Sequence, residues 1–479
     1  MRKLAVALGC ALAALVASVP AGAVDYGATE DTGKVSPDLI LGALQELGMI
    51  RNVVSLTFDP AQPDVLPQAD EIDRLVDAAP QYGVEIAIAV YGSRATSLAS
   101  VANLAAFSTW LQAAARRWPA VTTWIGPNEP NQPRFWQPQF TPACANASGR
   151  SYFRAQATMY DALKSVNAGI DVVGVALSPR GNDLCRARSN VSTSPVRFLR
   201  ALGLAMRASR RNRPLMDALS QHPYPLLNTH GPLKGYRWPN VGLPNMDRLK
   251  QAFWDAFAGT AQPTFEDGLR VHLDELGWQT DTWVDGHEGR ENVPVIDEWT
   301  QGRYYAQAVR LVACDPAVAS LSLFHLIDEH DLDRFQSGLL RLDGTPKESF
   351  GPVRAAISAV LDRGCAGKVV RWRHATGVVG ARATWRHATR SFAVTAEEDA
   401  TYAAAVVPAS TPRTAIARAL AVAGAPPAGS RGTLKAYRPG LVRVRRALRA
   451  GSYVTAVRLT AATNPRRSTV VVSRPFAVR

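Results

Sequence analysis

The sequence has 479 residues, of which 47% are hydrophobic and 20% are charged, and its formal net charge is +14. This composition excludes a disulfide-stapled miniprotein, a collagen-like chain and a disordered tail. The length predicts two domains, because an α/β barrel can use more than ~250 residues as a single unit.

The positive charge is concentrated near the C-terminus. Residues 366–479 contain 20 Lys and Arg residues and only three acidic residues, a net charge of +17, which leaves −3 for residues 1–365. A basic surface attracts polyanions through counterion release and steering, without identifying which one. We expect no nucleic acid as a partner. An acidic cell-envelope polymer bound by the basic region is one hypothesis, and a solvated surface is the other.

Residues 1–23 are typical of a secretory signal peptide. Arg2 and Lys3 precede an apolar run over residues 4–19, and the segment ends in the small residues Ala21-Gly22-Ala23. A retained N-terminal anchor is the alternative, although the apolar run is short and Ala-rich for a membrane span. No later segment has ~18 uninterrupted apolar residues, so we expect a secreted protein without a transmembrane segment once the signal is removed.

Removal of the signal leaves four cysteines, an even number in a chain that would reach an oxidising compartment. Three pairings are open. We predict Cys144 with Cys185 and Cys314 with Cys365, because each pair then closes one neighbouring stretch of the fold. No cysteine has another Cys or a His at close ligand spacing, so we expect no metal site there.

Residues 24–365 alternate short apolar runs with longer segments of helical period, a pattern that predicts βαβ units and a (β/α)8 TIM barrel. An open doubly wound sheet is the alternative, but the first strand–helix junction, residues 26–30, has no G-x-G-x-x-G motif. The eight expected strands are 24–29, 53–58, 84–91, 121–126, 171–177, 218–222, 270–275 and 319–326.

Residues 366–479 have a different pattern and predict a small all-β accessory domain, basic and sandwich-like. The segment contains short β-rich runs separated by turn-forming residues, and it has no obvious catalytic constellation. The expected strands are 369–372, 378–385, 391–395, 402–407, 433–437 and 453–460.

Two carboxylates stand where barrel strands are expected to end, which is where barrel enzymes place their reactive groups. Glu129 follows the fourth strand between Pro127 and Pro130, and Glu275 ends the seventh strand. Two carboxylates can split an acetal bond if one is protonated and the other ionised, because the leaving oxygen needs a proton and the anomeric carbon needs electron density.

Four motifs carry a resemblance to the retaining glycoside hydrolases of clan A, most like families 39 and 5. In chain order they follow the fourth, sixth, seventh and eighth expected strands, and they are Asn128-Glu129-Pro130, His222-Pro223-Tyr224, Glu275-Leu276-Gly277-Trp278 and the segment 338–347. The resemblance covers residues 24–364 and not the C-terminal region. It implies a TIM-barrel glycosidase that needs no cofactor.

The resemblance implies a role for each matching residue. Glu129 would be the general acid/base and Glu275 the nucleophile, while Asn128 would hydrogen-bond the sugar 2-hydroxyl. Tyr224 would donate its hydroxyl to Glu275, and His222 would line the same pocket. The aromatic residues Trp136 and Trp278 are further candidates for contact with the sugar.

The chain departs from the family pattern in two places. Clan members commonly have a Trp at the end of the eighth strand, where this chain has Phe324, which we expect to substitute as the sugar platform. An Arg commonly follows an early strand, and Arg94 is only a loose candidate. The charged segment 325–331 is predicted to be a loop and not a metal site, because adjacent residues rarely converge on one ion.

The sequence therefore predicts a secreted retaining glycosidase that cleaves a poly- or oligosaccharide by double displacement. The alternative is a non-catalytic carbohydrate-binding or cell-envelope-binding protein on a degenerate barrel. Whether Glu129 and Glu275 approach each other discriminates between them, since a binder does not need the pair.

Overall fold

The computed structural model describes residues 24–367, 369–422, 429–443 and 448–478. The predicted signal peptide lies outside the described residues. Within them, no helix is both long and apolar enough to cross a membrane.

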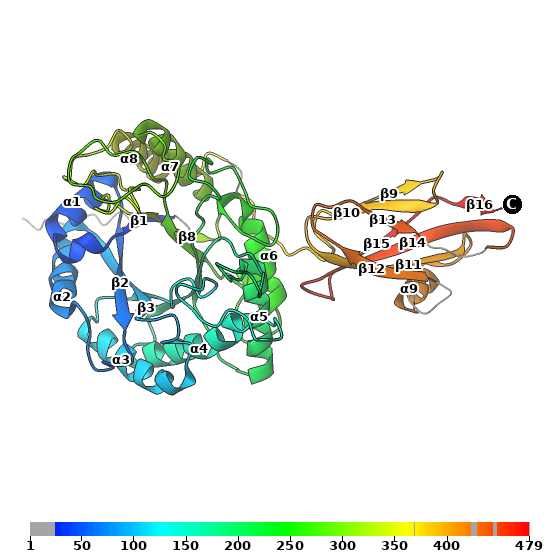
Figure 1. Ribbon diagram of the computed structural model, residues 1–479, viewed down its shortest axis with the longest axis horizontal. Helices are drawn as coiled ribbons and strands as arrows, with labels where there is room; N and C mark the ends of the chain where they lie inside the picture. Colours follow the sequence, from blue (N-terminus) through cyan, green and yellow to red (C-terminus); the bar gives the residue numbers. More distant parts are fainter. Residues whose placement is uncertain (1–23, 368, 423–428, 444–447, 479) are drawn as a thin grey trace, which may run out of the picture.

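Eight parallel strands form a closed barrel in chain order, and the last strand pairs with the first (Figure 1). The predicted barrel is therefore confirmed. Its strands are β1 (Asp25–Thr29), β2 (Arg51–Phe58), β3 (Glu85–Gly92), β4 (Thr123–Ile125), β5 (Asp171–Leu177), β6 (Ala218–Gln221), β7 (Val271–Leu276) and β8 (Val318–Phe324).

Helices surround the barrel and bury their apolar faces against it (Figure 1). The main helices are α1 (Pro37–Leu47), α2 (Ala69–Ala78), α3 (Leu104–Arg117), α4 (Ser148–Val166), α5 (Pro195–Ser209), α6 (Met246–Phe257), α7 (Glu298–Val312) and α8 (Phe350–Arg363). Short 3-10 helices are η1 (Asp31–Lys34), η2 (Ala79–Tyr82), η3 (Val101–Asn103), η4 (Leu243–Asn245) and η5 (Phe265–Asp267).

Helix α1 shows how local sequence sets an element. Pro37 occupies the first turn, where its missing N–H has no helical partner to lose. Ile40, Leu44 and Leu47 recur at helical spacing and are buried. Gly48 ends the helix with φ 71°, a left-handed conformation that a residue without Cβ adopts at little cost.

The C-terminal region forms two antiparallel sheets around a common core, here called the sandwich. One sheet contains β9 (Arg382–Arg386), β10 (Ser391–Thr395) and β13 (Gly440–Arg443). The other contains β11 (Ala400–Pro408), β12 (Gly429–Leu434), β14 (Gly451–Ala461), β15 (Ser468–Val472) and β16 (Phe476–Val478), with α9 (Arg413–Val422) beside it. The predicted all-β character is confirmed, but the expected strand at residues 369–372 is absent and α9 was not expected.

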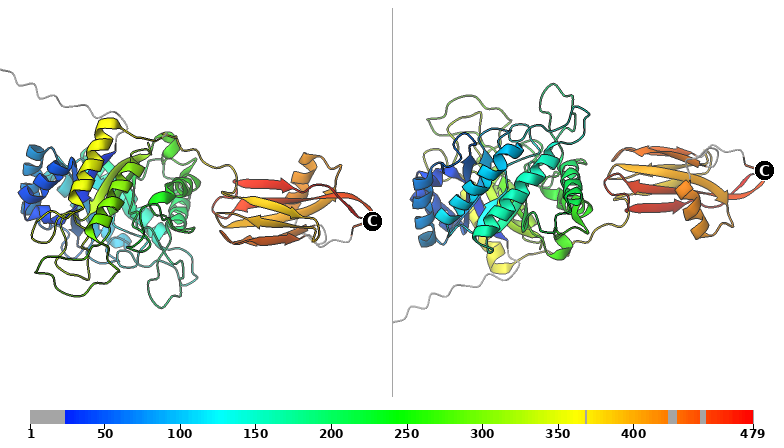
Figure 2. Two further views of the ribbon diagram at one scale, coloured as in Figure 1. Left: turned by 90° about the horizontal axis from the view of Figure 1, so that it is seen from above. Right: turned by 90° about the horizontal axis from the view of Figure 1, so that it is seen from below.

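Both predicted disulfides are present in the structure. Cys144–Cys185 joins the loop after β4 to the loop after β5. Cys314–Cys365 joins the chain after α7 to the chain after α8. Long loops project from one end of the barrel (Figure 2), and the first disulfide links two of them.

A buried ion-pair cluster attaches the sandwich to the barrel. Arg467 of the sandwich is 2% exposed and contacts Asp255 of α6 at 2.8 Å and Glu398 at 2.6 Å. Beside it, the rings of Trp254 and His374 stack with centroids 3.8 Å apart. Part of the basic charge of the C-terminal region is therefore neutralised internally.

Replacement of Arg467 by Met is expected to lower the free energy of unfolding by about 3–5 kcal/mol, because two buried carboxylates lose their shared cation. Urea denaturation measures this loss. The matched control is Arg466→Met, since Arg466 is exposed and its replacement should change stability by less than ~0.5 kcal/mol. Equal stability of the two variants would contradict the interpretation of this cluster as the attachment point.

Candidate active site

Glu129 and Glu275 lie together at the end of the barrel where the strands finish. One oxygen of each carboxylate and one ring nitrogen of His222 are all within 4.8 Å of one another. The three residues come from the ends of β4, β6 and β7. Parallel barrel strands all end on one face, so residues that are about 50 to 150 positions apart in the chain converge there.

The backbone around Glu129 is held in a strained turn. Glu129 has φ 35°, a conformation that costs a non-glycine residue free energy and persists only where the surroundings impose it. Its N–H donates to the Ala176 carbonyl at 3.0 Å. The buried amide of Asn131 donates to the carbonyls of Ser178 and Thr193, both at 3.0 Å. These bonds hold the turn that carries Glu129 against β5 and the chain that follows it.

His222 bridges the two glutamates. Its Nδ1 lies 3.1 Å from Glu129 Oε1 and 3.3 Å from Glu275 Oε2, and its Nε2 lies 3.5 Å from Asp274 Oδ1. Burial lowers the pKa of His222, but the charges of Glu275, Asp274 and Glu129 outweigh it and raise the pKa to about 10. The ring is therefore an imidazolium at neutral pH, with both nitrogens available as donors.

Glu275 is held by two tyrosine hydroxyls. Tyr224 donates to Oε2 at 3.1 Å, and Tyr91 donates to Oε1 at 3.4 Å. Burial raises the pKa of Glu275 to about 7, and Glu129 and Asp274 add to the rise, while His222 and the Tyr224 hydroxyl oppose it. Glu129 is partly buried, and its negative charge close to the buried Glu275 is one of the causes that favour the protonated form of Glu275.

The ligand atoms of Glu129, His222 and Glu275 have the spacing that a metal ion could use, but His222 would have to lose its proton to bind one. Within the described residues, the segment 325–331 forms no cluster of three ligand atoms. Its Asp328 instead pairs with Lys347 at 2.7 Å.

Asn128 and Phe324 lie beside the carboxylates at strand ends. Asn128 is 7% exposed, and no residue in the described ranges hydrogen-bonds to its carboxamide, which leaves that group for a ligand. Phe324 is half-buried and packs edge-to-face against Phe335 and Tyr224, with centroids 4.9 and 6.1 Å apart. These aromatic rings form one side of the site.

Trp136 and Trp278 lie elsewhere, and the expectation that they contact the sugar is corrected. Each indole is 1% exposed. Trp136 packs against Tyr152 and donates to Ser151, while Trp278 packs against Tyr305 and donates to the His230 carbonyl. An indole whose faces are covered by protein cannot stack on a sugar ring.

Three residues of the site, Tyr91, Asp274 and Phe335, were not predicted from the sequence. Tyr91 is the last residue but one of β3, as Glu275 is of β7, so a search of strand ends for polar groups could have identified it. Asp274 holds His222 from the side opposite the glutamates, and Phe335 completes the aromatic side. Arg94 is exposed on the surface, and the cation beside Glu275 is His222.

Comparison with known proteins gives matches to solved structures only. No protein-family model matches the sequence, and no curated protein matches it. A family 39 glycoside hydrolase from Bacteroides cellulosilyticus WH2 is 17% identical and has a TM-score of 0.50, over 82% of this chain and 74% of that chain. A glucosidase from Croceicoccus marinus is 13% identical, with a TM-score of 0.47, over 92% of this chain and 88% of that chain.

A GH5_18 protein from Streptomyces cattleya, solved in complex with GlcNAc, is 13% identical, with a TM-score of 0.48, over 74% of this chain and 84% of that chain. Sequence identities this low show similarity of fold alone. The family 39 structure, with its TM-score of 0.50, supports that similarity. The chain therefore shares the (β/α)8-barrel fold of that family 39 glycoside hydrolase.

Proposed function

We propose that the protein is a retaining glycoside hydrolase that cleaves O-glycosidic bonds of a poly- or oligosaccharide. The observation that carries this proposal is the approach of Glu129 and Glu275, whose nearest oxygens lie within 4.8 Å. Retaining enzymes place their two carboxyl groups ~5–5.5 Å apart, whereas inverting enzymes leave ~6.5–9.5 Å for a water molecule. The short separation favours direct attack by one carboxylate.

In the first step, Glu129 donates its proton to the glycosidic oxygen while a Glu275 oxygen attacks the anomeric carbon. The bond to the leaving group breaks, and a covalent glycosyl–Glu275 ester forms. In the second step, Glu129 takes a proton from water, and that water oxygen displaces Glu275 from the sugar.

The neighbouring residues support these two steps. The Tyr224 hydroxyl stabilises the ionised form of Glu275 and orients it. The His222 imidazolium contacts both carboxylates and offsets their mutual repulsion. Asn128 is placed to bond a sugar hydroxyl, and Phe324 offers an aromatic face on the same side.

A carbohydrate-binding protein on a degenerate barrel is the alternative. Such a protein gains nothing from two close carboxylates that repel each other, so the pair weighs against it. The acidic cell-envelope polymer remains a prediction from the charge pattern alone. The two disulfides support the proposed secretion, because disulfides persist in oxidising compartments.

Intact-protein mass spectrometry after exposure to 2-deoxy-2-fluoro glycosyl fluorides tests the proposal. We expect a mass increase of one glycosyl unit on the wild type and none on Glu275→Gln, because the ester forms on Glu275. An adduct on the variant as well would assign the nucleophile elsewhere. No adduct with any sugar, together with binding but no hydrolysis of glycans, would favour the carbohydrate-binding alternative.

The pH dependence of kcat/KM should depend on the Glu275 pKa. That pKa is raised to about 7, so protonation below this pH removes the nucleophile, and kcat/KM should fall about tenfold per pH unit. Tyr224→Phe removes a hydroxyl that lowers this pKa, so the acidic limb should move to higher pH. Tyr91→Phe, which removes the longer bond, should move it less. An unmoved limb in Tyr224→Phe would refute this account.

A further inference from the structure

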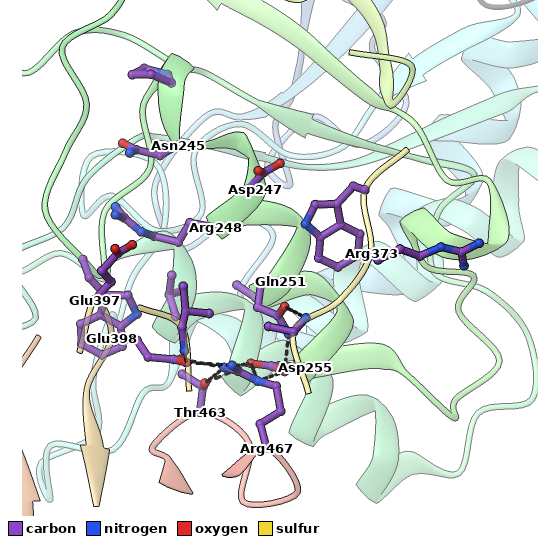
Figure 3. A pocket seen from close by; sticks show the side chains of 17 residues that line it. Asn245, Asp247, Arg248, Gln251, Asp255, Arg373, Glu397, Glu398, Thr463 and Arg467 are labelled. Atoms are coloured by element: carbon purple, nitrogen blue, oxygen red, sulfur yellow. Dashed lines mark hydrogen bonds and ion pairs between the residues drawn. The ribbon is translucent and has the colours of Figure 1, made fainter. Parts of the chain in front are cut away.

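A cavity lies where the barrel meets the sandwich, with a volume of about 330 Å³ (Figure 3). Helix α6 and the loop before it form one wall, and the segment before β9 and the turns of the sandwich form the other. Glu129, His222 and Glu275 do not line this cavity. Ligand sites often occupy clefts of this size at domain interfaces.

The floor of the cavity is already organised. Arg467 is fixed between Asp255 and Glu398, as Figure 3 shows. The Gln251 side chain donates to Asp255 at 3.1 Å and accepts from the Ala375 N–H at 2.7 Å, so it ties the two walls together. A ligand would therefore meet a preformed surface and would not need to order it.

Several groups that line the cavity make no hydrogen bond within the described residues. None of these residues accepts a hydrogen bond from the indole N–H of Trp238 or Trp372. Glu397 is exposed and makes no ion pair within the described part of the chain. The Asn245 carboxamide uses its oxygen for the Tyr236 and Gly242 N–H groups, and its NH₂ group stays free of described partners. The cavity thus offers both donors and acceptors next to aromatic surface.

The charge of the cavity selects against strongly ionic ligands. Three guanidinium groups, from Arg248, Arg373 and Arg467, face four carboxylates, and those carboxylates belong to Asp247, Asp255, Glu397 and Glu398. The near balance gives little net attraction for a phosphate or a cation. A ligand with many hydroxyl groups and an apolar C–H face matches the free donors, the free acceptors and the indoles together.

We propose that this cavity is an accessory binding site for a neutral saccharide, built jointly by the barrel and the sandwich. Occupancy does not require Glu129 or Glu275, which do not line the cavity, and the choice of a glycan as the ligand rests on the proposed glycosidase function. The docking of the sandwich creates the site, because each wall supplies one indole, Trp238 from the barrel and Trp372 from the linking segment.

The test uses the full chain with Glu275→Gln, so that the probes are not consumed. The probes are β-linked tetrasaccharides of glucose, xylose, mannose and N-acetylglucosamine, measured by calorimetry and saturation-transfer NMR up to millimolar concentrations. We expect at least one probe to show a binding event that Trp372→Ala weakens by about tenfold or more. The matched control is Trp299→Ala, which removes an exposed indole outside the cavity and should leave this event unchanged.

Glu397→Gln provides a second variant if Trp372→Ala disturbs docking, because it is isosteric and exposed. It should weaken the same binding event by about tenfold through loss of a charge-assisted hydrogen bond. Binding that neither variant changes, or no binding of any probe, would overturn the proposal. The fluorosugar adduct on Glu275 does not involve the cavity, so failure of this proposal and failure of the proposed function are distinguishable.

Discussion

Glu275→Ala is expected to lower kcat by about 10⁴-fold or more, the largest functional effect of any single substitution in this chain. Without the carboxylate, no covalent intermediate forms and the oxocarbenium-like transition state loses the negative charge beside it. Initial rates on an aryl glycoside that the wild type cleaves measure the loss. A variant that keeps more than ~10% of the wild-type kcat would exclude Glu275 as the nucleophile.

Glu129→Ala separates the acid/base role from the nucleophilic role. Its effect should depend on the leaving group, because a good leaving group departs without a proton while a poor one needs it. We expect a loss of about 10²–10⁴-fold for a sugar leaving group and a much smaller loss in the first step for dinitrophenyl glycosides. Equal losses for both substrates would contradict the assignment of Glu129 as the proton donor.

Lys347→Met is expected to lower the free energy of unfolding by about 3–5 kcal/mol, the largest stability effect expected within the barrel. Lys347 is 1% exposed and its ammonium contacts Asp328 at 2.7 Å, with further bonds to Thr280 and the Gln336 carbonyl. Its removal leaves the Asp328 carboxylate buried without a counter-charge. Urea denaturation measures the effect.

The double variant Asp328→Asn/Lys347→Met provides the control for that prediction. It removes both charges, so much of the lost stability should return, although the bond from the Gly338 N–H to residue 328 must be kept by the amide oxygen. If the double variant is as unstable as Lys347→Met, the loss comes from packing and not from an unpaired charge.

The expectation that polar groups at strand ends share one face placed Glu129 and Glu275 together, because it depends on topology alone. Once the alternating pattern predicts parallel strands in a barrel, every strand end must lie on the same face, and Glu129 and Glu275 follow. The same rule applied to β3 would have added Tyr91. Chain position does not distinguish a Trp that contacts a ligand from a Trp of the core, because the side chain suits both places. Only the packing of the folded chain shows that Trp136 and Trp278 are buried in the core.

The C-terminal region was predicted less completely. Short strands such as β13, β15 and β16 have four, five and three residues, too few for a clear alternation of side chains. Helix α9 lies where the sequence suggested only links between strands. Its Ile416 and Leu420 pack against the strand β14 residues Val454 and Ala456, a long-range contact that no local pattern reveals.

The sequence by itself determined the barrel, the all-β character of the C-terminal region and the strands on which the two glutamates stand, because each of these follows from local periodicity or from chain order. Among three open cysteine pairings it favoured the one that the structure shows. Tertiary structure alone decided the distance between Glu129 and Glu275, the placement of His222 between them, and the burial of Trp136 and Trp278. The cavity between the barrel and the sandwich also exists only in the tertiary structure, because residues of both parts line it. These features depend on contacts between residues far apart in the chain, whose relative positions are set only when the core packs.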